Sequence, residues 1–185
     1  MESTNMQTEI DKALATLKQG GIILYPTDTI WGIGCDATNT DAIAKIFKLK
    51  KRVDSKALIS LVANEQQLKL ITENIPVLDI TSSPTTIVYP NVKKLGQNLL
   101  AENGSAAIRI VQDTFCQKLI LSFGKAIVST SANISEEMAP KQFSEISKEI
   151  KNNVDYIVNL RQNELMSTPS SILIINEDTR ITKIR

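Results

Sequence analysis

"GGIILYPTDTIWGIGCDA", residues 20–37, indicates the fold more directly than any other stretch of this chain. Two glycines end a helical pattern, and the short apolar run at residues 22–25 is typical of a buried strand. The small and polar residues that follow, at 27–37, predict a loop. Ligands often bind beyond strand ends in α/β proteins, although a turn held by local Thr and Asp hydrogen bonds is the commoner explanation for such residues.

Helix and strand patterns alternate on both sides of this stretch. Apolar residues at helical spacing predict helices at residues 8–19, 41–51, 65–71, 114–123 and 143–152, the second capped by Asn39 or Thr40. Further strands are predicted at residues 57–63, 85–90, 106–111, 126–130, 156–160, 170–175 and 181–184. We therefore predict a single α/β domain over residues 1–185, with a mixed parallel and antiparallel sheet flanked by helices.

The composition excludes several classes of function. The 21 Lys and Arg nearly balance the 20 Asp and Glu, so broad attraction to nucleic acid or anionic membrane is not expected. Because there is no histidine, a His-based triad, a His general base and any His-containing metal site are excluded. Two cysteines do not make a disulfide framework, and no membrane span or secretory signal is visible, so we expect a cytoplasmic protein.

Positive charge is nevertheless concentrated in the second half of the second predicted helix and just beyond it. Six cations lie within twelve residues that contain one acid: Lys45, Lys48, Lys50, Lys51, Arg52 and Lys56. Cations at a helix C-terminus complement its dipole by about 0.3–1 kcal/mol each, which explains one or two of them. Arg52 and Lys56 continue past the expected helix end, and Arg and Lys together suit a polyphosphate. The cluster is therefore either a solvated helix end or an anion site.

Polar residues also follow the strand in "AIVSTSANIS", residues 126–135. Its hydroxyls, amide and backbone N–H groups suit phosphate or carboxylate, although they equally suit a helix cap. Arg109 interrupts the apolar strand "AAIRIV", where a buried charge needs a partner. That partner is either a structural Asp or Glu, the commoner case, or a substrate carboxylate. Neither a P-loop nor a Gly-x-Gly-x-x-Gly fingerprint is present.

Taken together, these segments resemble the YrdC/TsaC family of threonylcarbamoyl-AMP synthases. "YPTDTIWGIGCDA" is similar to the family signature Y-P-T-[DE]-T-x-[YW]-G-[LI]-G-x-[DN]-A. The tripeptides at 50–52 and 131–133 match its K-x-R…S-x-N tetrad, and "AAIRIV" and "STPSSILII" match two of its strands. The resemblance runs in order from about Gly20 to Arg185 and covers nearly the whole chain.

The resemblance implies a twisted open sheet of YrdC/RibB-like type around a deep, basic cavity. It also implies a nucleotidyltransferase that makes threonylcarbamoyl-AMP and pyrophosphate from L-threonine, bicarbonate or CO2, and ATP. The product would serve the N6-threonylcarbamoyl modification of adenosine 37 in tRNA, through a separate TsaD-type transferase. Direct binding of tRNA or double-stranded RNA is a further possible partnership, and Mg2+ would arrive with ATP, held mainly by its phosphates rather than by a protein metal site.

Residue roles follow from the same resemblance. The catalytic set would be Lys50, Arg52, Ser131 and Asn133. The ATP site would comprise Lys50, Arg52, Lys56, Thr86, Ser131 and Arg185. The L-threonine site would comprise Thr29, Arg109, Ser129 and Ser170. Departures from the family pattern are "SSPTT" at 82–86 for P-G-P-x-T, "KAL" at 56–58 for N-P-L, and a missing glycine after Ser135.

Two alternatives remain at this point. A non-enzymatic RNA-binding or ribosome-maturation protein on the same fold would use the basic residues for RNA, but 4% aromatic residues offer little base stacking. A sugar-phosphate lyase of the same sheet type would resemble dihydroxybutanone phosphate synthase and would need acidic metal ligands and a histidine, which this chain lacks.

Overall fold

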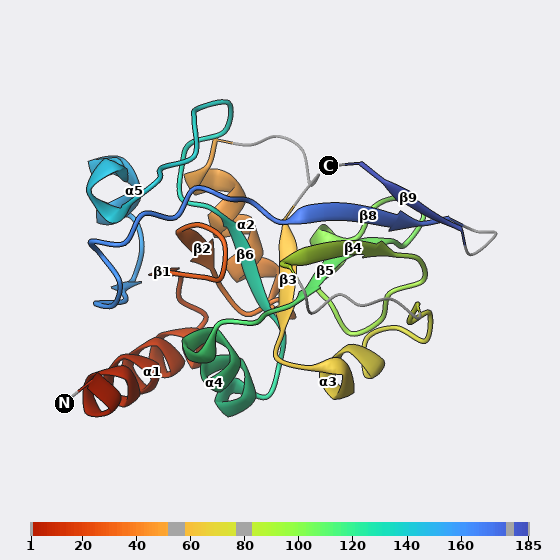
Figure 1. Ribbon diagram of the computed structural model, residues 1–185, viewed down its shortest axis with the longest axis horizontal. Coiled ribbons are helices and arrows are strands. Elements are labelled where there is room, and N and C mark those ends of the chain that lie inside the picture. Colours follow the sequence, from red (N-terminus) through yellow and green to blue (C-terminus); the bar gives the residue numbers. More distant parts are fainter. Residues whose placement is uncertain (1, 52–57, 77–82, 177–179, 185) are drawn as a thin grey trace.

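The computed structural model describes residues 2–51, 58–76, 83–176 and 180–184 (Figure 1). Three predicted site residues, Arg52, Lys56 and Arg185, lie outside the described residues. The helices are α1 (Glu2–Lys18), α2 (Thr40–Leu49), α3 (Glu65–Lys69), α4 (Thr114–Phe123) and α5 (Lys148–Asn152), with 3-10 turns η1 (Gln97–Leu99) and η2 (Phe143–Glu145). No helix within the described ranges is long and apolar enough to cross a bilayer.

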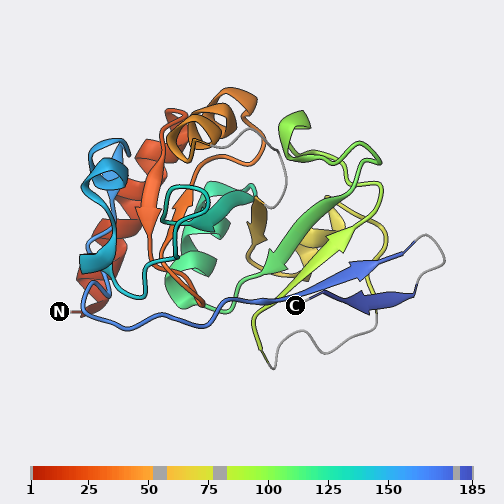
Figure 2. The same ribbon diagram turned by 90° about the horizontal axis from the view of Figure 1, so that it is seen from above.

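The strands form one nine-stranded sheet in the order β7-β1-β2-β6-β3-β5-β4-β8-β9 (Figures 1 and 2). They are β1 (Ile23–Tyr25), β2 (Gly32–Gly34), β3 (Ile59–Val62), β4 (Thr85–Tyr89), β5 (Ala106–Ile110), β6 (Ile127–Ser131), β7 (Tyr156–Ile157), β8 (Ser171–Ile175) and β9 (Ile181–Lys183). Three pairs are parallel, β1 with β7, β3 with β5 and β4 with β8, and the other five are antiparallel. The prediction of a mixed sheet flanked by helices is confirmed.

The sheet separates two apolar cores because successive residues of a strand point to opposite faces. Leu61 and Ile127 belong to the core beneath α1 and α4, which pack side by side (Figure 1). Val62 and Val128, the next residue on each strand, belong to the core beneath α2. Ser129 shares the face of Ile127, and Arg109 is the register partner of Leu61, so both lie on the α1 and α4 face of the sheet.

Strand β2 lies inside the stretch that the sequence predicted as a loop, and that prediction was wrong. Glycine is uncommon in strands, so the sequence carries no signal for this one. The strand exists because it is paired on both sides, with β1 and with β6. A Cβ on Gly34 would lie 2.5 Å from the Val128 carbonyl oxygen and 2.6 Å from the Tyr25 ring, so only glycine permits this close approach.

The helix predicted at residues 143–152 is interrupted. Ile146 has extended backbone angles (φ −65°, ψ 128°), and it separates η2 from α5. The Ser147 side chain then accepts a hydrogen bond from the Ile150 backbone N–H and begins α5 as its N-cap. Near the N-terminus of the chain, α1 begins six residues earlier than predicted, at Glu2, and Gly20 (φ 71°) follows it in the left-handed conformation that favours glycine.

Candidate functional site

A cavity of about 1240 Å³ opens on the sheet face that α1 and α4 share, beyond the part that these helices cover. It exceeds the roughly 300–1,000 Å³ of common ligand pockets, so it has room for more than one small substrate. Its hydroxyl and guanidinium groups come from the loop after β1, from β4, β5 and β6, and from the residue before β8: Thr29, Thr86, Arg109, Ser129, Thr130, Ser131 and Ser170. An apolar floor extends it along Val88, Ile172 and Ile174.

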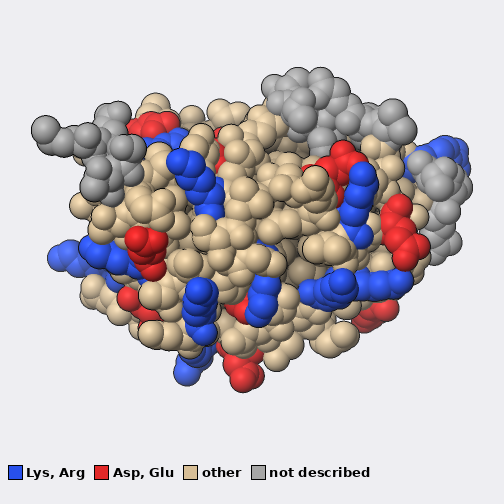
Figure 3. All heavy atoms as spheres, turned by 90° about the horizontal axis from the view of Figure 1, so that it is seen from below, with Lys and Arg blue, Asp and Glu red and all other residues tan. Residues whose placement is uncertain are grey.

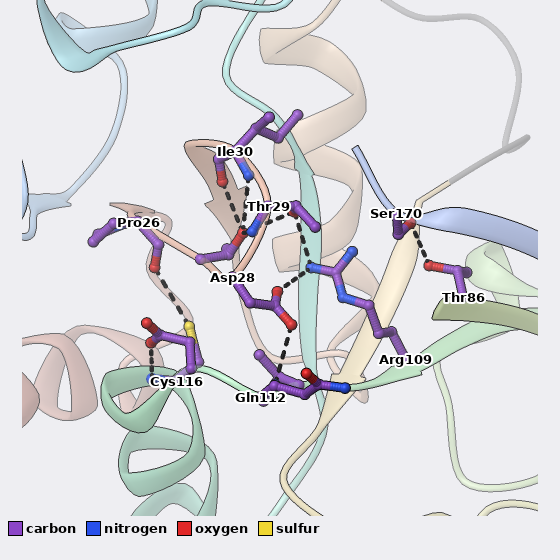
Figure 4. A network of polar contacts seen from close by, with 12 residues as sticks. Pro26, Asp28, Thr29, Ile30, Thr86, Arg109, Gln112, Cys116 and Ser170 are labelled. Carbon is purple, nitrogen blue, oxygen red and sulfur yellow. Dashed lines mark hydrogen bonds and ion pairs between the residues drawn. The ribbon is translucent and has the colours of Figure 1, made fainter. Parts of the chain in front are cut away.

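The parallel pairing of β4 with β8 builds one wall of this cavity. Thr86 is the register partner of Ile172, which brings Ser170 alongside it from 84 residues away in the chain. The two hydroxyl oxygens lie 2.8 Å apart and share a hydrogen bond (Figure 4). Both residues are buried, so their hydroxyls have fixed positions facing the cavity.

Arg109 is the cation of the described cavity wall, and its side chain is only 3% exposed. Its Nη2 donates to Asp28 Oδ1 at 2.9 Å and to Thr29 Oγ1 at 3.3 Å (Figure 4). The structural acid that the sequence allowed as a partner is therefore present. Within the described residues, the buried Nε has no hydrogen-bond partner. A buried donor in this state is costly unless a ligand or water satisfies it.

The loop after β1 is held by its own threonines. Thr27 Oγ1 donates to the Ile30 carbonyl at 2.8 Å and accepts the backbone N–H groups of Thr29 and Ile30 at 3.1 and 3.3 Å. The hydroxyl oxygens of Thr27 and Thr29 are 3.0 Å apart. This arrangement is the local side-chain turn expected for these residues, and it also fixes the Thr29 hydroxyl beside Arg109.

Lys50 ends α2 as a second buried cation, 2% exposed. Its Nζ donates to the carbonyl oxygens of Ser131 and Asn133, both at 2.6 Å, and its own carbonyl accepts the Ser135 N–H at 3.0 Å. Asn133 Nδ2 in turn donates to the Glu137 carbonyl at 2.7 Å. Neither Lys50 nor Asn133 is among the described residues that line the cavity. Both hold the loop that follows Ser131.

The predicted site residues thus fall into three groups. Six of them line one cavity: Thr29, Thr86, Arg109, Ser129, Ser131 and Ser170. Lys50 and Asn133 lie behind Ser131, and the remaining three lie outside the described residues. The described lining contains one cation, Arg109, and one acid, Glu102, so a basic character remains a prediction that depends on Arg52, Lys56 and Arg185.

Sequence reasoning missed two residues within its own strongest motif. Asp28 pairs with Arg109, and the acidic position of "YPTDT" was the available signal. Gly32 lines the cavity, and a Cβ there would lie 2.9 Å from Ser129 Oγ. Any other residue at position 32 would therefore displace the Ser129 hydroxyl from its place in the wall.

The weak acids closest to the site are held neutral. Burial raises the pKa of Tyr25 well above its ordinary value, and its hydroxyl donates to the Val128 carbonyl at 3.1 Å. Burial also raises the pKa of the Cys116 thiol, which donates to the Pro26 carbonyl at 3.4 Å (Figure 4). Neither group is an available nucleophile or base at neutral pH.

The described residues show neither a cluster of metal ligands nor, on the face of Figure 3, a surface of one charge. Across the described ranges, no three Cys, Asp or Glu side chains converge to hold a metal ion. The face shown in Figure 3 carries Lys and Arg interspersed with Asp and Glu, in agreement with the near-balanced composition. On that face, charge of one sign is not gathered into a broad track of the kind that nucleic-acid backbones require.

Comparison with known proteins gives consistent results. A threonylcarbamoyl-AMP synthase from Psychromonas ingrahamii is 32% identical over 185 residues, covering 95% of this chain and 96% of that protein. A second threonylcarbamoyl-AMP synthase, from Vibrio parahaemolyticus, is 35% identical over 133 residues, covering 68% of this chain and 72% of that protein.

Solved structures share the fold. A P. abyssi Sua5 complexed with L-threonine has a TM-score of 0.80 at 21% identity, and E. coli YciO has 0.81 at 20%. This chain spans 53% of the Sua5 chain and 89% of the YciO chain, while each comparison covers at least 95% of this chain. The family model Sua5/YciO/YrdC, described as "Telomere recombination", matches residues 15–185. The chain belongs to the Sua5/YciO/YrdC family.

Proposed function

We propose that this protein is a threonylcarbamoyl-AMP synthase, which condenses L-threonine, bicarbonate or CO2, and ATP to threonylcarbamoyl-AMP and pyrophosphate. The observation that carries the proposal is the buried Arg109 guanidinium, set among hydroxyl groups in a cavity larger than one small substrate needs. The relatives named threonylcarbamoyl-AMP synthase, which match over most of their own length, support it.

The threonine would bind at the Arg109 end of the cavity. The guanidinium suits a carboxylate, and its buried Nε, which has no hydrogen-bond partner within the described residues, would be satisfied by the substrate. Thr29, Ser129 and Ser170 line the same region and offer hydroxyls to the amine and side chain of threonine. A site built to hydrogen-bond a substrate discriminates strongly against analogues that lack the bonded group.

ATP would occupy the part of the cavity nearer Ser131 and Thr86, with Arg52, Lys56 and Arg185 around its phosphates. Lys50 and Asn133 would support this region through the loop that carries Ser131. The described lining offers hydroxyl oxygens and the single carboxylate of Glu102, which fits a Mg2+ ion held chiefly by ATP phosphates. That ion would neutralise phosphate charge during the transfer.

The reaction needs little covalent participation from the protein. The threonine amine and bicarbonate give a carbamate and water. A carbamate oxygen then forms a bond to the α-phosphorus of ATP while the bond to the bridging oxygen of pyrophosphate breaks. Both reactants are anionic, so positioned cations and hydroxyl donors supply the catalysis by orientation and charge neutralisation. The neutral state of Tyr25 and Cys116 is compatible with this chemistry.

In the cell, the product would pass to a TsaD-type transferase for modification of tRNA in the cytoplasm. The acyl phosphate anhydride in threonylcarbamoyl-AMP is reactive toward water, so the enzyme that consumes it should act soon after release. The transferase would supply the tRNA contacts.

The test is pyrophosphate release by the purified protein with ATP, Mg2+ and bicarbonate, with and without L-threonine. We expect release that depends on threonine and is weaker with L-serine, whose side chain lacks one methyl group. A folded protein that binds ATP but releases no pyrophosphate on threonine addition would contradict the proposal. Salt-sensitive RNA binding in that same protein would instead favour the RNA-binding alternative.

A further inference from the structure

Asp28 has no assigned role in the reaction, yet both of its carboxylate oxygens are used. Oδ1 accepts from Arg109 Nη2 at 2.9 Å, and Oδ2 accepts the Gln112 backbone N–H at 3.1 Å (Figure 4). The side chain is 7% exposed, and that of its arginine partner 3%. Asp28 therefore joins the loop after β1 to both β5 and the segment beyond it.

We propose that Asp28 is a positioning residue that orients the Arg109 guanidinium for the carboxylate of the substrate. This inference rests on the proposed function, because it takes threonine as the ligand of Arg109. Asp28 does not itself touch the substrate, and it acts through the arginine.

The distribution of donors on Arg109 supports this role. Asp28 and Thr29 both bind Nη2, on one side of the planar group. The second terminal nitrogen, Nη1, points away from Asp28, and it has no hydrogen-bond partner among the described residues (Figure 4). Because the guanidinium is rigid, holding Nη2 also fixes the direction of Nη1. The cavity therefore presents a donor that is already oriented when threonine arrives.

The energetics of a buried charge also favour Asp28 as the residue that orients Arg109. A buried guanidinium without a counter-ion is costly, and Asp28 supplies that counter-ion in the unliganded protein. A long side chain that is ordered before binding loses less conformational entropy when the ligand arrives. Asp28 thus keeps Arg109 both charged and ordered, at the cost of partly screening its charge.

Asp28→Asn is the informative substitution because it keeps the size and removes the charge. Its amide has one oxygen and one NH2 group, so it can satisfy only one of Arg109 Nη2 and the Gln112 N–H. Asp28→Glu keeps the charge on a longer side chain. The matched control is Asp36→Asn: Asp36 is also buried and paired with a cation, Lys125, but it does not line the cavity.

The experiment is titration calorimetry of wild type and the three variants with L-threonine, L-threoninol and ATP. L-Threoninol carries a hydroxymethyl group where threonine has its carboxylate. We expect Asp28→Asn to raise the Kd for threonine about tenfold or more, the factor that one charge-assisted hydrogen bond supplies, with the Kd for ATP unchanged. The ratio of the affinity for threonine to the affinity for threoninol should also fall in Asp28→Asn. Asp28→Glu should recover part of both losses, and Asp36→Asn should change neither.

The outcomes separate the two claims. If wild type binds threonine and Asp28→Asn keeps the same affinity and the same preference over threoninol, the role of Asp28 is refuted while the proposed function stands. If wild type binds no threonine, both fail. Circular dichroism checks folding, and if Asp28→Asn does not fold, Asp28→Glu carries the test. Because its carboxylate is displaced by one methylene, Asp28→Glu should show a weakened but not abolished affinity and preference. A folded Asp28→Glu with the affinity and preference of wild type would overturn the role.

Discussion

Among the described residues, two cations are almost completely buried, and their surroundings differ. Arg109 is paired with a carboxylate and a hydroxyl, and it lines the cavity. Lys50 is held by the backbone carbonyl oxygens of Ser131 and Asn133, and it is not among the described residues that line the cavity. Sequence reasoning gave both of them direct contact with a substrate. Arg109 lies at the cavity, whereas Lys50 holds the loop after Ser131, and substrate contact by either residue stays a prediction.

The difference shows how the partner of a buried cation indicates its role. A carboxylate beside one edge of a guanidinium leaves donors on the other edge for a ligand. Two carbonyl oxygens at 2.6 Å engage the ammonium directly, and their dipoles stabilise its charge. A phosphate contact from Lys50 would compete with these bonds. The ammonium has a third N–H donor, however, so the contact with ATP that the family resemblance implies stays a prediction.

Replacing Arg109 should have the largest effect. Arg109→Met leaves the Asp28 carboxylate buried without its counter-ion, so we expect the free energy of unfolding to fall by about 3–5 kcal/mol. Adding Asp28→Asn to the same protein should restore part of that loss, because the uncompensated charge is removed. Urea unfolding of the two single variants and the double variant measures the coupling. Simple additivity in this cycle would contradict a direct ion pair.

Replacing Lys50, the other buried cation, should have the next largest effect. Lys50→Met deprives two buried carbonyl oxygens of a charged donor, and we expect a loss of about 2–3 kcal/mol in the free energy of unfolding. Amide hydrogen exchange should also accelerate in the loop after β6. Lys45→Met is the control, because Lys45 donates to the Gly20 carbonyl at an exposed site and should cost less than about 0.5 kcal/mol. Equal stability of the two variants would show that Lys50 does not hold the loop.

Raising the pH tests groups that burial keeps neutral rather than charged. Burial raises the pKa of Tyr89 from 10.0 to about 12, and it raises the pKa of Cys35 above its ordinary value of 9.0. The unfolded chain therefore loses these protons at lower pH than the folded protein does. Stability should be constant below about pH 9 and fall progressively from there to about pH 12. Thermal unfolding between pH 7 and 11 measures the trend, and a rise in stability over this interval would contradict it.

The smallest effect is expected from replacing one of two adjacent serines, Ser170 and Ser171. Ser170→Ala removes the partner of the buried Thr86 hydroxyl, so we expect a loss of about 1 kcal/mol and a higher KM for threonine. Ser171 lies outside the cavity lining and only shares a 3.2 Å contact with Thr85. Ser171→Ala should leave the KM unchanged. An equal rise in KM for both variants would place the effect in the strand rather than in the site.

Much of the fold was predictable where local chemistry decides it. The bounds of α4 agree with its helical pattern, and Asn39 caps α2 through its side chain as predicted. Strand β2 was not predictable, because its pairing partners rather than its own residues make it a strand. The helix predicted over 143–152 failed because a local cap at Ser147 competes with helix continuation at Ile146.

The site divides in the same way. Part of its hydroxyl wall was predictable, since Ser131 and Ser170 occur at strand ends where α/β proteins place ligands. The pairing of Arg109 with Asp28 joins residues 81 positions apart, and only the register of the sheet brings them together. The partners of Lys50 are backbone carbonyls, and because every residue carries one, no sequence pattern indicates which will be used.

The parallel pairing of β4 with β8 also has a consequence for synthesis on the ribosome. A nascent chain that has emerged only through β6 already contains Thr29, Thr86, Arg109 and Ser129, but β8 has not yet docked and Ser170 is missing from the wall. Pairings between distant segments form late because loop closure must precede them. Substrate capture should therefore begin only after the C-terminal strand has docked. A bound substrate would then stabilise the whole sheet against global unfolding rather than one part of it.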